Sequence, residues 1–215
     1  MPHPLERVLA MVGPNSCPSL CNFHCHTLCS DGSLEPIALI KQASELGLVH
    51  LSVTDHHSSH AHQPMNDWIA KQQSEGIHVP TLWSGMEISA LLKGCLVHIL
   101  ALGFEIDHFS LKPYNHGRSV VGQELRAESV VKAIHDAGGL AVLAHPARYR
   151  IGYKELIDEA ALIWFDGGEA WYDYEMNSIW KASPLICEAI ERKLTNVGLL
   201  HTCGTDTHGI DLGGR

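Results

Sequence analysis

The sequence predicts an α/β protein in which buried strands alternate with amphipathic helices. Short runs of β-branched or apolar residues alternate along the chain with stretches whose apolar residues repeat at helical spacing. His, Asp or Glu follows five of the apolar runs at the point where each run ends. Because catalytic side chains gather at the C-terminal ends of the strands in parallel βα barrels, these patterns together favour βα units around a parallel sheet.

The expected elements can be placed along the chain in order. The helix at 34–46 follows Ser33, a favourable N-cap residue, and ends at Gly47, a favourable C-cap residue. The helix at 123–136 stops at Gly138. The other helices are expected at 67–75, 154–162 and 184–194, and the strands at 49–53, 77–83, 96–102, 140–144, 163–165 and 197–200.

A single domain is expected for most of the chain. The 215 residues, 45% of them hydrophobic, are enough for one sizeable core. Residues 1–20 are expected to be an N-terminal leader into the first strand, because Gly13 and Pro14 interrupt their short apolar patch and no signal-peptide core is present. Residues 21–215 are expected to form the domain.

The charge of the chain limits its partners. Lys and Arg number 15 against 24 Asp and Glu, which gives a formal net charge of −9. Long duplex nucleic acid and anionic membranes are bound by basic surfaces, so we expect neither as a partner. No apolar run reaches the length of a membrane span. A small phosphorylated substrate or a short nucleic-acid end stays open, and the sequence indicates no oligomeric state.

The cysteines are interpreted as reduced thiols. Four of the seven recur at intervals of four residues: Cys17, Cys21, Cys25 and Cys29. On one helix this spacing could hold zinc or an iron–sulfur cluster, but Pro18 and the strand-like stretch 21–27 argue against a helix. Reduced cysteines are typical of the cytoplasm, which is the expected location.

Two short motifs have the spacing of metal ligands. In a strand, residues i and i+2 project to one face, so His24 and His26 can bind one ion, and Asp206 and His208 can pair in the same way. Chance is the alternative for either motif alone, because the chain contains 16 histidines. Asp31 lies in an expected turn and could be only a turn residue or helix cap.

Seven motifs follow one another in a fixed order. They are His24-Cys25-His26, Ser30-Asp31-Gly32, Thr54-Asp55-His56, Gly85-Met86-Glu87, Val97-His98, Ala144-His145-Pro146 and Gly204-Thr205-Asp206-Thr207-His208. In this order the sequence resembles the PHP (polymerase and histidinol phosphatase) domain family, from about residue 21 to 210. The resemblance implies a distorted (β/α)7 TIM-like barrel in which all nine metal ligands of the family's pattern are present.

The resemblance implies two or three divalent transition-metal ions. The first would be bound by His24, His26, Glu87 and Asp206, the second by Glu87 as a bridge with His98 and His145, and the third by Asp31, His56 and His208. Six imidazoles, and four carboxylates when the nearby Asp55 is counted, suit Mn²⁺, Fe²⁺ or Zn²⁺ better than Mg²⁺ or Ca²⁺.

Some of these residues, and three others, are expected to act on the substrate. Asp206 and His208 are expected to be catalytic as well as metal-binding. Arg148 is expected in catalysis and substrate binding, because a guanidinium binds phosphate oxygens bidentately. Arg118, in the loop-like stretch 114–122, and His201, at a strand end, are further substrate-binding candidates; a surface arginine and a core histidine are the alternatives.

Other side chains near these motifs are interpreted as structural or solvated. His57, His60 and His62 are expected to be solvated loop residues. Tyr172 is expected to pack, with stacking on a base as the alternative. In related PHP phosphatases that act on nucleotides, an insertion between the equivalents of His98 and His145 helps to form the substrate pocket; only 46 residues lie between the two here.

The expected function is hydrolysis of a small phosphate ester, such as a nucleotide or short oligonucleotide end, by a metal-activated hydroxide. One alternative is a histidinol-phosphate phosphatase. The other is a metal-binding or polymerase-associated module without catalytic activity.

Overall fold

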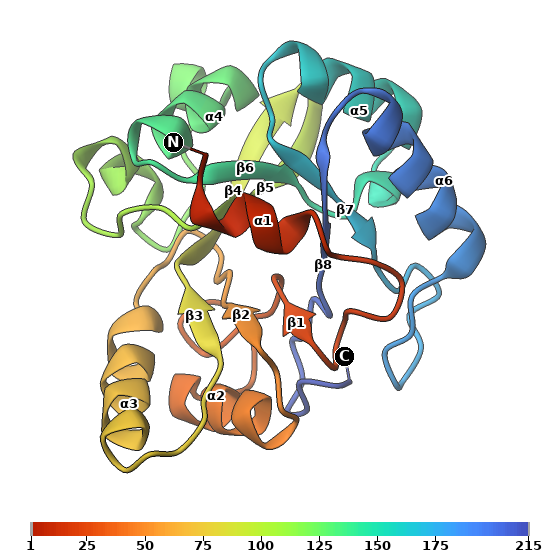
Figure 1. The fold of residues 1–215 in the computed structure, drawn as a ribbon. Helices are drawn as coiled ribbons and strands as arrows, with labels where there is room; N and C mark the ends of the chain where they lie inside the picture. Colours follow the sequence, from red (N-terminus) through yellow and green to blue (C-terminus); the bar gives the residue numbers. More distant parts are fainter. Residues whose placement is uncertain (1, 215) are drawn as a thin grey trace.

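The protein is a mixed α/β structure with two sheets (Figure 1). This computed structural model describes residues 2–214. The first sheet is parallel, in the order β1-β2-β3, and the second has the order β4-β5-β6-β7-β8. The strands are β1 (Cys21–Asn22), β2 (His50–Ser52), β3 (Thr81–Trp83), β4 (Gly85–Leu92), β5 (Cys95–Leu102), β6 (Leu140–Leu143), β7 (Gly167–Trp171) and β8 (Leu200–Cys203).

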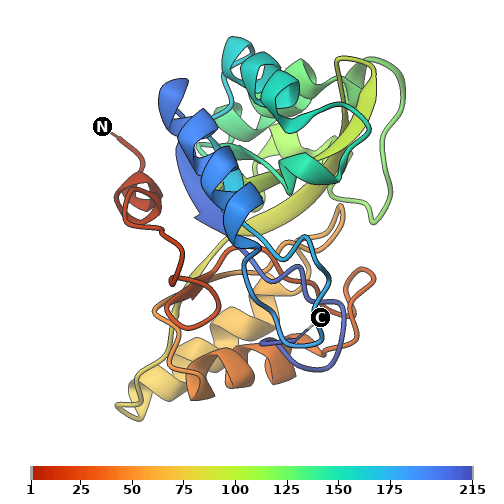
Figure 2. The ribbon, with the colours of Figure 1, turned by 90° about the vertical axis from the view of Figure 1, so that its right-hand side faces the viewer.

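The helices cover the sheets on their outer sides (Figures 1 and 2). They are α1 (Pro4–Leu9), α2 (Pro36–Glu45), α3 (His62–Ser74), α4 (Ala127–Asp136), α5 (Tyr153–Leu162) and α6 (Pro184–Asn196), with shorter 3₁₀ turns between some of them. Helices α2 and α3 lie beside the three-stranded sheet, and α4, α5 and α6 beside the five-stranded sheet. Each sheet with its helices encloses its own hydrophobic cluster, the larger one around the five-stranded sheet.

The five predicted helices are all present, but α3 begins five residues earlier than predicted, and α1 was not predicted. In α2, Pro36 occupies the first turn, and Leu39, Ile40 and Ala43 are buried on one face. The chain then leaves the helix at Gly47, which has a φ of +76°. The stretch 123–136 divides into a 3₁₀ turn and α4, because Arg126 between them is extended.

Two of the predicted strands are wrong in position, and one hairpin was not predicted. Residues 163–165 turn away from the end of α5, with Trp164 at a φ of +70°, and the strand is β7 instead. Residues 197–200 are mostly the turn before β8. Strands β4 and β5 pair antiparallel around Lys93 and Gly94, both at positive φ, which is the turn conformation that favours tight hairpins.

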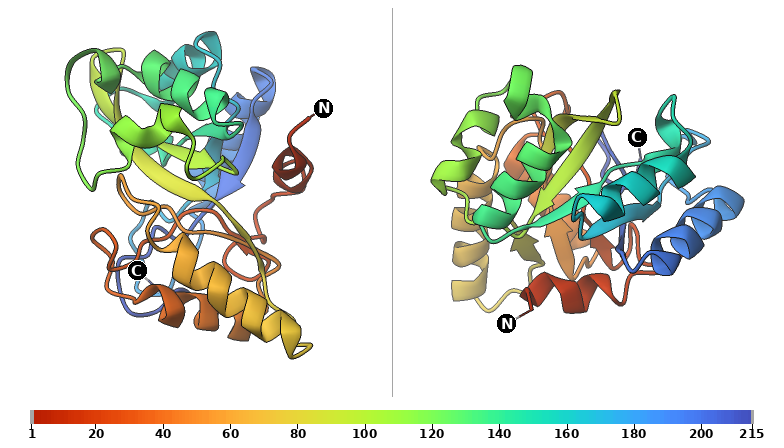
Figure 3. Two further views of the ribbon diagram at one scale, coloured as in Figure 1. Left: turned by 90° about the vertical axis from the view of Figure 1, so that its left-hand side faces the viewer. Right: turned by 90° about the horizontal axis from the view of Figure 1, so that it is seen from above.

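A closed seven-stranded barrel is not confirmed. Strand β5 runs antiparallel to both β4 and β6, and only β6, β7 and β8 are parallel within the second sheet. The two sheets are joined by single bridges, Cys25 to Thr207 and His56 to Glu87. Figure 3 shows the two sheets and their helices from two further sides. The arrangement brings the loops that follow β1, β2, β6 and β8 to the centre of the molecule.

The first twenty residues contribute to the core. Leu5 and Leu9 of α1 are buried in the larger hydrophobic cluster. His3 caps this helix and its Nε2 lies 3.0 Å from the carbonyl oxygen of Gly103. No helix between residues 2 and 214 has the length and apolarity needed to cross a membrane.

Gly204 is expected to be irreplaceable, because its backbone packs directly on His24. A Cβ at this position would lie 2.1 Å from the Cβ of His24. We expect Gly204→Ala to lower the free energy of unfolding by about 1–3 kcal/mol, as overpacking does, and to displace His24. Thermal unfolding measures this loss. Gly152→Ala is the matched control, because open space surrounds Gly152 at a φ of −62°; equal melting temperatures for the two variants would contradict the prediction.

Candidate metal centre

Four loops and one hairpin bring the nine predicted ligands together. His24 and His26 follow β1, His56 follows β2, and Asp206 and His208 follow β8. His145 comes two residues after β6, and Asp31 lies in the loop after β1. Glu87 and His98 lie inside strands β4 and β5 rather than at strand ends.

Alternation along β4 places Glu87 in the centre. Met86 and Ile88 belong to the hydrophobic cluster, and Glu87 between them projects to the opposite face. The Glu87 side chain is 1% exposed. A buried carboxylate of this kind is stabilised only where cations or hydrogen-bond donors surround it.

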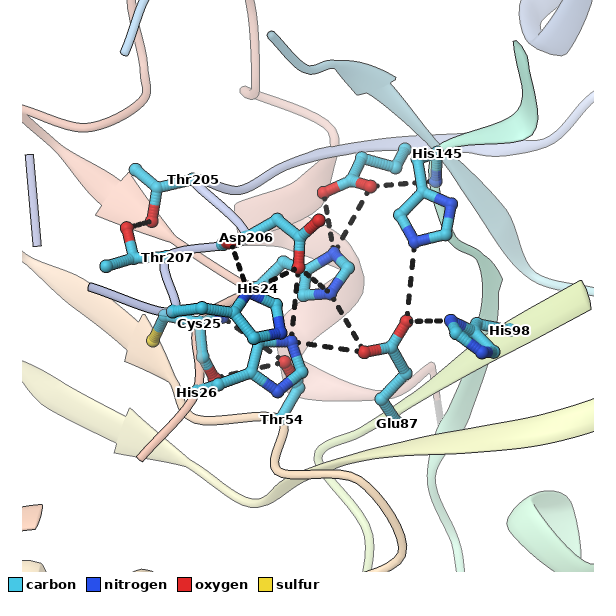
Figure 4. A network of polar contacts seen from close by, with 12 residues as sticks. His24, Cys25, His26, Thr54, Glu87, His98, His145, Thr205, Asp206 and Thr207 are labelled. Carbon is cyan, nitrogen blue, oxygen red and sulfur yellow. Dashed lines mark hydrogen bonds and ion pairs between the residues drawn. The ribbon is translucent and has the colours of Figure 1, made fainter. Parts of the chain in front are cut away.

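Four buried side chains form the inner group of the centre (Figure 4). The Nε2 atoms of His24 and His26 each lie 3.1 Å from Glu87 Oε2. The same two atoms lie 3.3 and 3.2 Å from Asp206 Oδ1. These four residues are the ones that the resemblance assigned to the first ion, and their ligand atoms all lie within 4.8 Å of one another.

A second group shares the Glu87 carboxylate. Its Oε1 lies 2.7 Å from His98 Nδ1 and 3.4 Å from His145 Nε2, and its Oε2 lies 3.5 Å from His56 Nε2. The ligand atoms of His56, Glu87 and His98 are within 4.8 Å of one another. Glu87 thus faces five histidines in all, which is the environment expected for a bridging ligand.

A third group surrounds Asp31 at the outer side. Asp31 Oδ2 lies 3.3 Å from His208 Nε2 and 3.7 Å from His56 Nε2, and Oδ1 lies 3.6 Å from His26 Nδ1. The third set that the resemblance implied is therefore present, with His26 as an additional neighbour.

Unpartnered polar atoms fit a metal at this centre. Glu87 Oε1, both ring nitrogens of His26 and His145 Nδ1 are buried, and none makes a hydrogen bond within the described residues 2–214. Several of these atoms approach one another at ion-pair distance, but without hydrogen-bond geometry. Buried polar atoms without partners are rare, and convergent imidazole and carboxylate lone pairs are the donor set of a transition metal.

The carboxylates hold protons on the central histidines of the metal-free protein. Burial opposes the charge on His24, but Glu169, Glu87 and Asp206 outweigh it and raise the pKa of His24 well above its usual value. Burial also opposes the charge on His26, yet Asp206 and Glu87 raise its pKa to about 9. A metal ion must displace these protons when it binds.

Three other groups of the centre are already in their metal-binding protonation state. Burial lowers the pKa of His56 to about 4, so this imidazole is neutral at pH 7. Burial opposes the ionisation of Glu87, but His24 and His98 outweigh it and hold the pKa of Glu87 well below its usual range. His24 has the same effect on Asp206. Two ionised carboxylates and a neutral imidazole are therefore available at neutral pH.

Glu169 contacts the centre, and the sequence reasoning missed it. Its Oε1 lies 3.1 Å from His24 Nδ1, on the side of the ring away from Glu87, and its Oε2 accepts the backbone N–H of His145 at 2.8 Å. A carboxylate on the second ring nitrogen fixes the orientation and tautomer of a metal-binding histidine. The signal was hidden because Glu169 belongs to β7, whose position the sequence misplaced.

Glu169→Gln is expected to weaken metal binding by about 10–100-fold, as loss of such an outer partner does. The amide keeps the size of the side chain but removes the negative charge beside His24. Metal affinity can be measured by competition with a chelating dye. The matched control is Glu188→Gln on the surface of α6. Unchanged affinity in Glu169→Gln would contradict the role given to this residue.

Asp55 stabilises a loop and is not among the clustered ligand atoms. Its Oδ1 accepts hydrogen bonds from the backbone of Thr27 at 2.7 Å and from Ser30 Oγ at 2.7 Å, and its Oδ2 accepts one from Thr27 Oγ at 2.6 Å. These bonds fix the turn that carries Asp31. The inclusion of Asp55 with the metal carboxylates is therefore corrected.

Arg148 joins the centre through Tyr172 and Asp206. The hydroxyl of Tyr172 donates to Asp206 Oδ2 at 2.6 Å and accepts from Arg148 NH1 at 2.7 Å. Arg148 NH1 also lies 3.1 Å from Asp206 Oδ2. Asp206 therefore presents Oδ1 to the histidines and Oδ2 to these two partners. The sequence reasoning expected Tyr172 to pack or to stack on a base and missed this contact.

A cavity of about 300 Å³ opens over the centre. It is lined by His56, Glu87, His98, His145, Arg148, Tyr149, Asp206 and His208. Arg148 is 41% exposed, so its remaining nitrogens can reach a ligand in this space. The lining is polar and carries six of the nine predicted ligands.

The other two substrate-binding candidates lie outside this cavity. Arg118 lines a separate cavity of about 480 Å³ with His116 and Glu124. The backbone N–H of Gly117 donates to the carbonyl of His57 at 2.8 Å, so this loop is fixed next to the metal centre. His201 is at the beginning of β8, opposite to the end that carries Asp206, and its Nε2 lies 3.0 Å from Thr195 Oγ1.

His57 and His62 are buried rather than solvated. His57 Nε2 accepts the backbone N–H of Ser89 at 3.1 Å, and His62 Nε2 accepts that of Gly85 at 3.1 Å. The two rings therefore brace β4 two residues before and two residues after Glu87. The expectation of solvated side chains holds for His60 alone, which is exposed.

Backbone strain is concentrated at the centre. His145 and Asp206 have φ values of +27° and +52°, and His57 has +50°. This region is unfavourable for residues with a Cβ and is found where surrounding structure imposes it, often at functional sites. Three of the six non-glycine residues at positive φ within residues 2–214 are in or next to the centre.

Comparison with known proteins gives related sequences and related folds. The chain is 27% identical over 143 residues to the 5′-3′ exoribonuclease Rnm of Escherichia coli, which is 60% of this chain and 47% of that protein. It is 30% identical over 142 residues to a 5′-3′ exoribonuclease of Haemophilus influenzae, 60% of this chain and 50% of that protein. The matches therefore span about half the length of these relatives. No family model matches the chain.

Solved structures share the fold at low sequence identity. A candidate metal-dependent phosphoesterase from Bifidobacterium adolescentis has a TM-score of 0.70 at 20% identity, with 92% of this chain and 91% of that chain covered. An amidohydrolase from Chromobacterium violaceum, solved with sulfate and no metal, has a TM-score of 0.71 at 20% identity and coverages of 90% and 89%.

A two-domain protein from Bacteroides vulgatus contains a domain predicted to be a PHP-like metal-dependent phosphoesterase. Its TM-score is 0.57 at 18% identity, and the match covers 88% of this chain and 52% of that one. The ordered motifs had predicted this likeness. The resemblance to the PHP family is confirmed: the chain has the fold of the PHP-like metal-dependent phosphoesterases.

Proposed function

We propose that the protein is a metal-dependent phosphoesterase that hydrolyses phosphate esters of nucleotides or of short nucleic-acid ends. The observation that carries the proposal is the sharing of one buried carboxylate, Glu87, by five histidines beneath a polar cavity. The sequence similarity to two 5′-3′ exoribonucleases supports nucleic-acid ends as the substrate class.

Two or three ions of Mn²⁺, Fe²⁺ or Zn²⁺ would be held by the three groups described above. When bound, such ions lower the pKa of a water molecule towards neutrality and neutralise phosphoryl oxygens. We further infer a distorted barrel of the PHP type as the frame of the site, since single bridges already link the two sheets beside His26 and Glu87.

Arg148 is proposed to bind the phosphoryl group. Its NH1 atom holds Tyr172 and Asp206, and the rest of the exposed fork faces the cavity. A guanidinium held in this way keeps its charge and binds two oxygens in a fixed geometry. Tyr172 and Asp206 orient it.

Arg118 is proposed to bind a second phosphate of a longer substrate. The loop that carries it is fixed to His57 through Gly117, one residue from His56 of the metal centre. Arg118→Ala is therefore expected to raise the KM for an oligonucleotide about tenfold, the loss of one charged hydrogen bond. The KM for an aryl phosphate, which cannot extend to Arg118, should not change. Equal effects on both substrates, measured by steady-state kinetics, would contradict this role.

The protein is also proposed to act in a reducing compartment such as the cytoplasm. All seven cysteines carry free thiols. Cys21 and Cys203 lie with their sulfur atoms 3.6 Å apart as hydrogen-bonded thiols and not as a disulfide.

The test of the proposed function is hydrolysis by the Mn²⁺-loaded protein. The substrates would be a 5′-phosphorylated short RNA, nucleoside mono- and bisphosphates, histidinol phosphate and an aryl phosphate. We expect product from the nucleotide substrates and none from Asp206→Asn, whereas Asp67→Asn on the surface of α3 should match the wild type.

The alternatives give different outcomes. Selective hydrolysis of histidinol phosphate would show that the protein is a histidinol-phosphate phosphatase. A protein that binds Mn²⁺ and releases product from none of these substrates would favour a binding module, and would contradict the proposal.

A further inference from the structure

The hydroxyl of Tyr149 accepts one hydrogen bond and keeps its own proton free. It accepts the backbone N–H of His98 at 2.8 Å. Within the described part of the chain, residues 2–214, no side chain or carbonyl accepts the hydrogen of this hydroxyl. A hydroxyl can donate one hydrogen bond and accept two. Because the oxygen of Tyr149 already accepts the His98 N–H, the O–H hydrogen stays available to a ligand.

Tyr149 is held rigidly at the wall of the central cavity. It follows the 3₁₀ turn Pro146–Arg148, and its ring centroid lies 5.4 Å from that of His145. The bond from His98 connects it to β5. With contacts to two elements that carry predicted ligands, the phenol is preorganised before any substrate enters.

The other side chains that line the cavity are a charged guanidinium and predicted metal ligands. Arg148 is permanently charged, and its NH1 is already engaged by Tyr172 and Asp206. Tyr149 is therefore the neutral O–H donor of the lining. The six remaining lining residues are predicted metal ligands: His56, Glu87, His98, His145, Asp206 and His208.

Hydrolysis of a phosphate ester creates a need for such a donor. The oxygen of the attacking water forms a new bond to phosphorus and releases one proton to solvent, and the bond between phosphorus and the ester oxygen breaks. The electron pair of that bond leaves with the ester oxygen, which becomes negative and takes its final proton from solvent. A preorganised donor aimed at developing negative charge contributes about 10²–10³-fold to the rate.

We propose that Tyr149 is a further catalytic residue, whose hydroxyl donates a hydrogen bond to the leaving oxygen of the bound ester. This inference rests on the proposed phosphoesterase function. It assigns a specific atom to the leaving group, while Arg148 binds the oxygens that stay on phosphorus. Tyr149 keeps its own proton throughout the reaction.

The test compares how much Tyr149→Phe lowers the rate of hydrolysis for substrates with two different leaving groups. Phenylalanine keeps the ring and the cavity wall and removes only the hydroxyl. We expect the rate to fall about 100-fold with a nucleoside monophosphate, whose leaving group is an alkoxide, because one preorganised donor is lost. With a nitrophenyl phosphate, whose leaving oxygen needs little stabilisation, the rate should fall less than about threefold on the same principle.

Two further measurements separate catalysis from structure. Bound Mn²⁺ should be unchanged in Tyr149→Phe, and the melting temperature should fall only slightly, because the backbone N–H of His98 loses its acceptor. Tyr174→Phe is the matched control: among residues 2–214 the hydroxyl of Tyr174 meets only the backbone N–H of Ala147, at 3.4 Å, and Tyr174 does not line the cavity. We expect this variant to hydrolyse both substrates as the wild type does.

Other outcomes would overturn the inference. An equal loss with both leaving groups would show that the hydroxyl positions the site as a whole. No loss with either would show that the phenol is not used, while the phosphoesterase function itself would stand. A wild-type protein that hydrolyses neither substrate would overturn both proposals.

Discussion

Glu87→Gln is expected to abolish hydrolysis, with a loss of at least about 100-fold, and to remove metal from two of the three groups. Glu87 is the carboxylate between His24 and His26 on one side and His98 and His145 on the other. Glutamine keeps the shape but has no negative charge, and it places N–H donors against imidazole nitrogens. Removing a residue that only hydrogen-bonds a metal ligand already lowers metal affinity or activity by about 10–100-fold. Removing a carboxylate that is itself shared by two metal groups should therefore lower them further.

Metal content by elemental analysis and turnover of a nucleotide substrate measure this effect together. Glu188→Gln on the exposed surface of α6 is the control for the same change of side chain. A Glu87→Gln protein that retained full metal content would show that the ions are bound elsewhere. One that retained both metal and turnover would contradict the site.

Metal affinity is expected to rise steeply with pH, by about tenfold per pH unit for each proton displaced. In the metal-free protein the pKa of His26 is raised to about 9 and that of His24 well above its usual value. Below these values the imidazoles are protonated, and a metal ion must release the protons to bind. The affinity should therefore increase from pH 6.5 to 8.5 and level off above the raised pKa values.

Titration of metal-free protein with Mn²⁺ at several pH values measures this dependence, and proton release can be followed in weakly buffered solution. His78→Asn, which removes an exposed histidine, should leave the slope unchanged. Glu169→Gln should make the slope shallower, because Glu169 raises the pKa of His24. A pH-independent affinity in the wild type would contradict the protonation states described for the centre.

The inner ligands could be predicted from the sequence because their signal is local. His24 and His26 alternate on one face, as Asp206 and His208 do, and each pair follows an apolar run. The order of motifs then joined these pairs to Glu87. Local spacing thus indicated the two pairs, and the resemblance to the PHP family implied the rest of the set; the structure brings all nine predicted ligands together.

The supporting contacts could not be predicted, because they depend on chain pairing. Glu169 follows Gly167 and Gly168, which give no β-branched or apolar signal for a strand, so β7 was placed too early. Tyr172 reaches Asp206 only because β7 and β8 are neighbours in the sheet. Asp55 lies within a ligand motif yet bonds Thr27, a choice that spacing cannot reveal.

Arg118 and His201 illustrate the same limit for substrate residues. Loop character suggested Arg118, but only the bond between Gly117 and His57 shows that its loop lies beside the centre. His201 was expected to follow the C-terminal end of a strand at 197–200, but the strand lies about three residues later. The residue proves to be at the beginning of β8, whereas the site is at its end.

The most direct test of a metal-dependent phosphoesterase is a titration of activity with metal. The protein would be stripped with a chelator, and hydrolysis of a 5′-phosphorylated short RNA would be measured as Mn²⁺ is returned, with bound metal counted in the same samples. We predict no turnover in the stripped protein and full recovery as two to three ions bind. Turnover that persists without metal, or bound metal without turnover of this RNA or any other phosphate ester, would contradict the account.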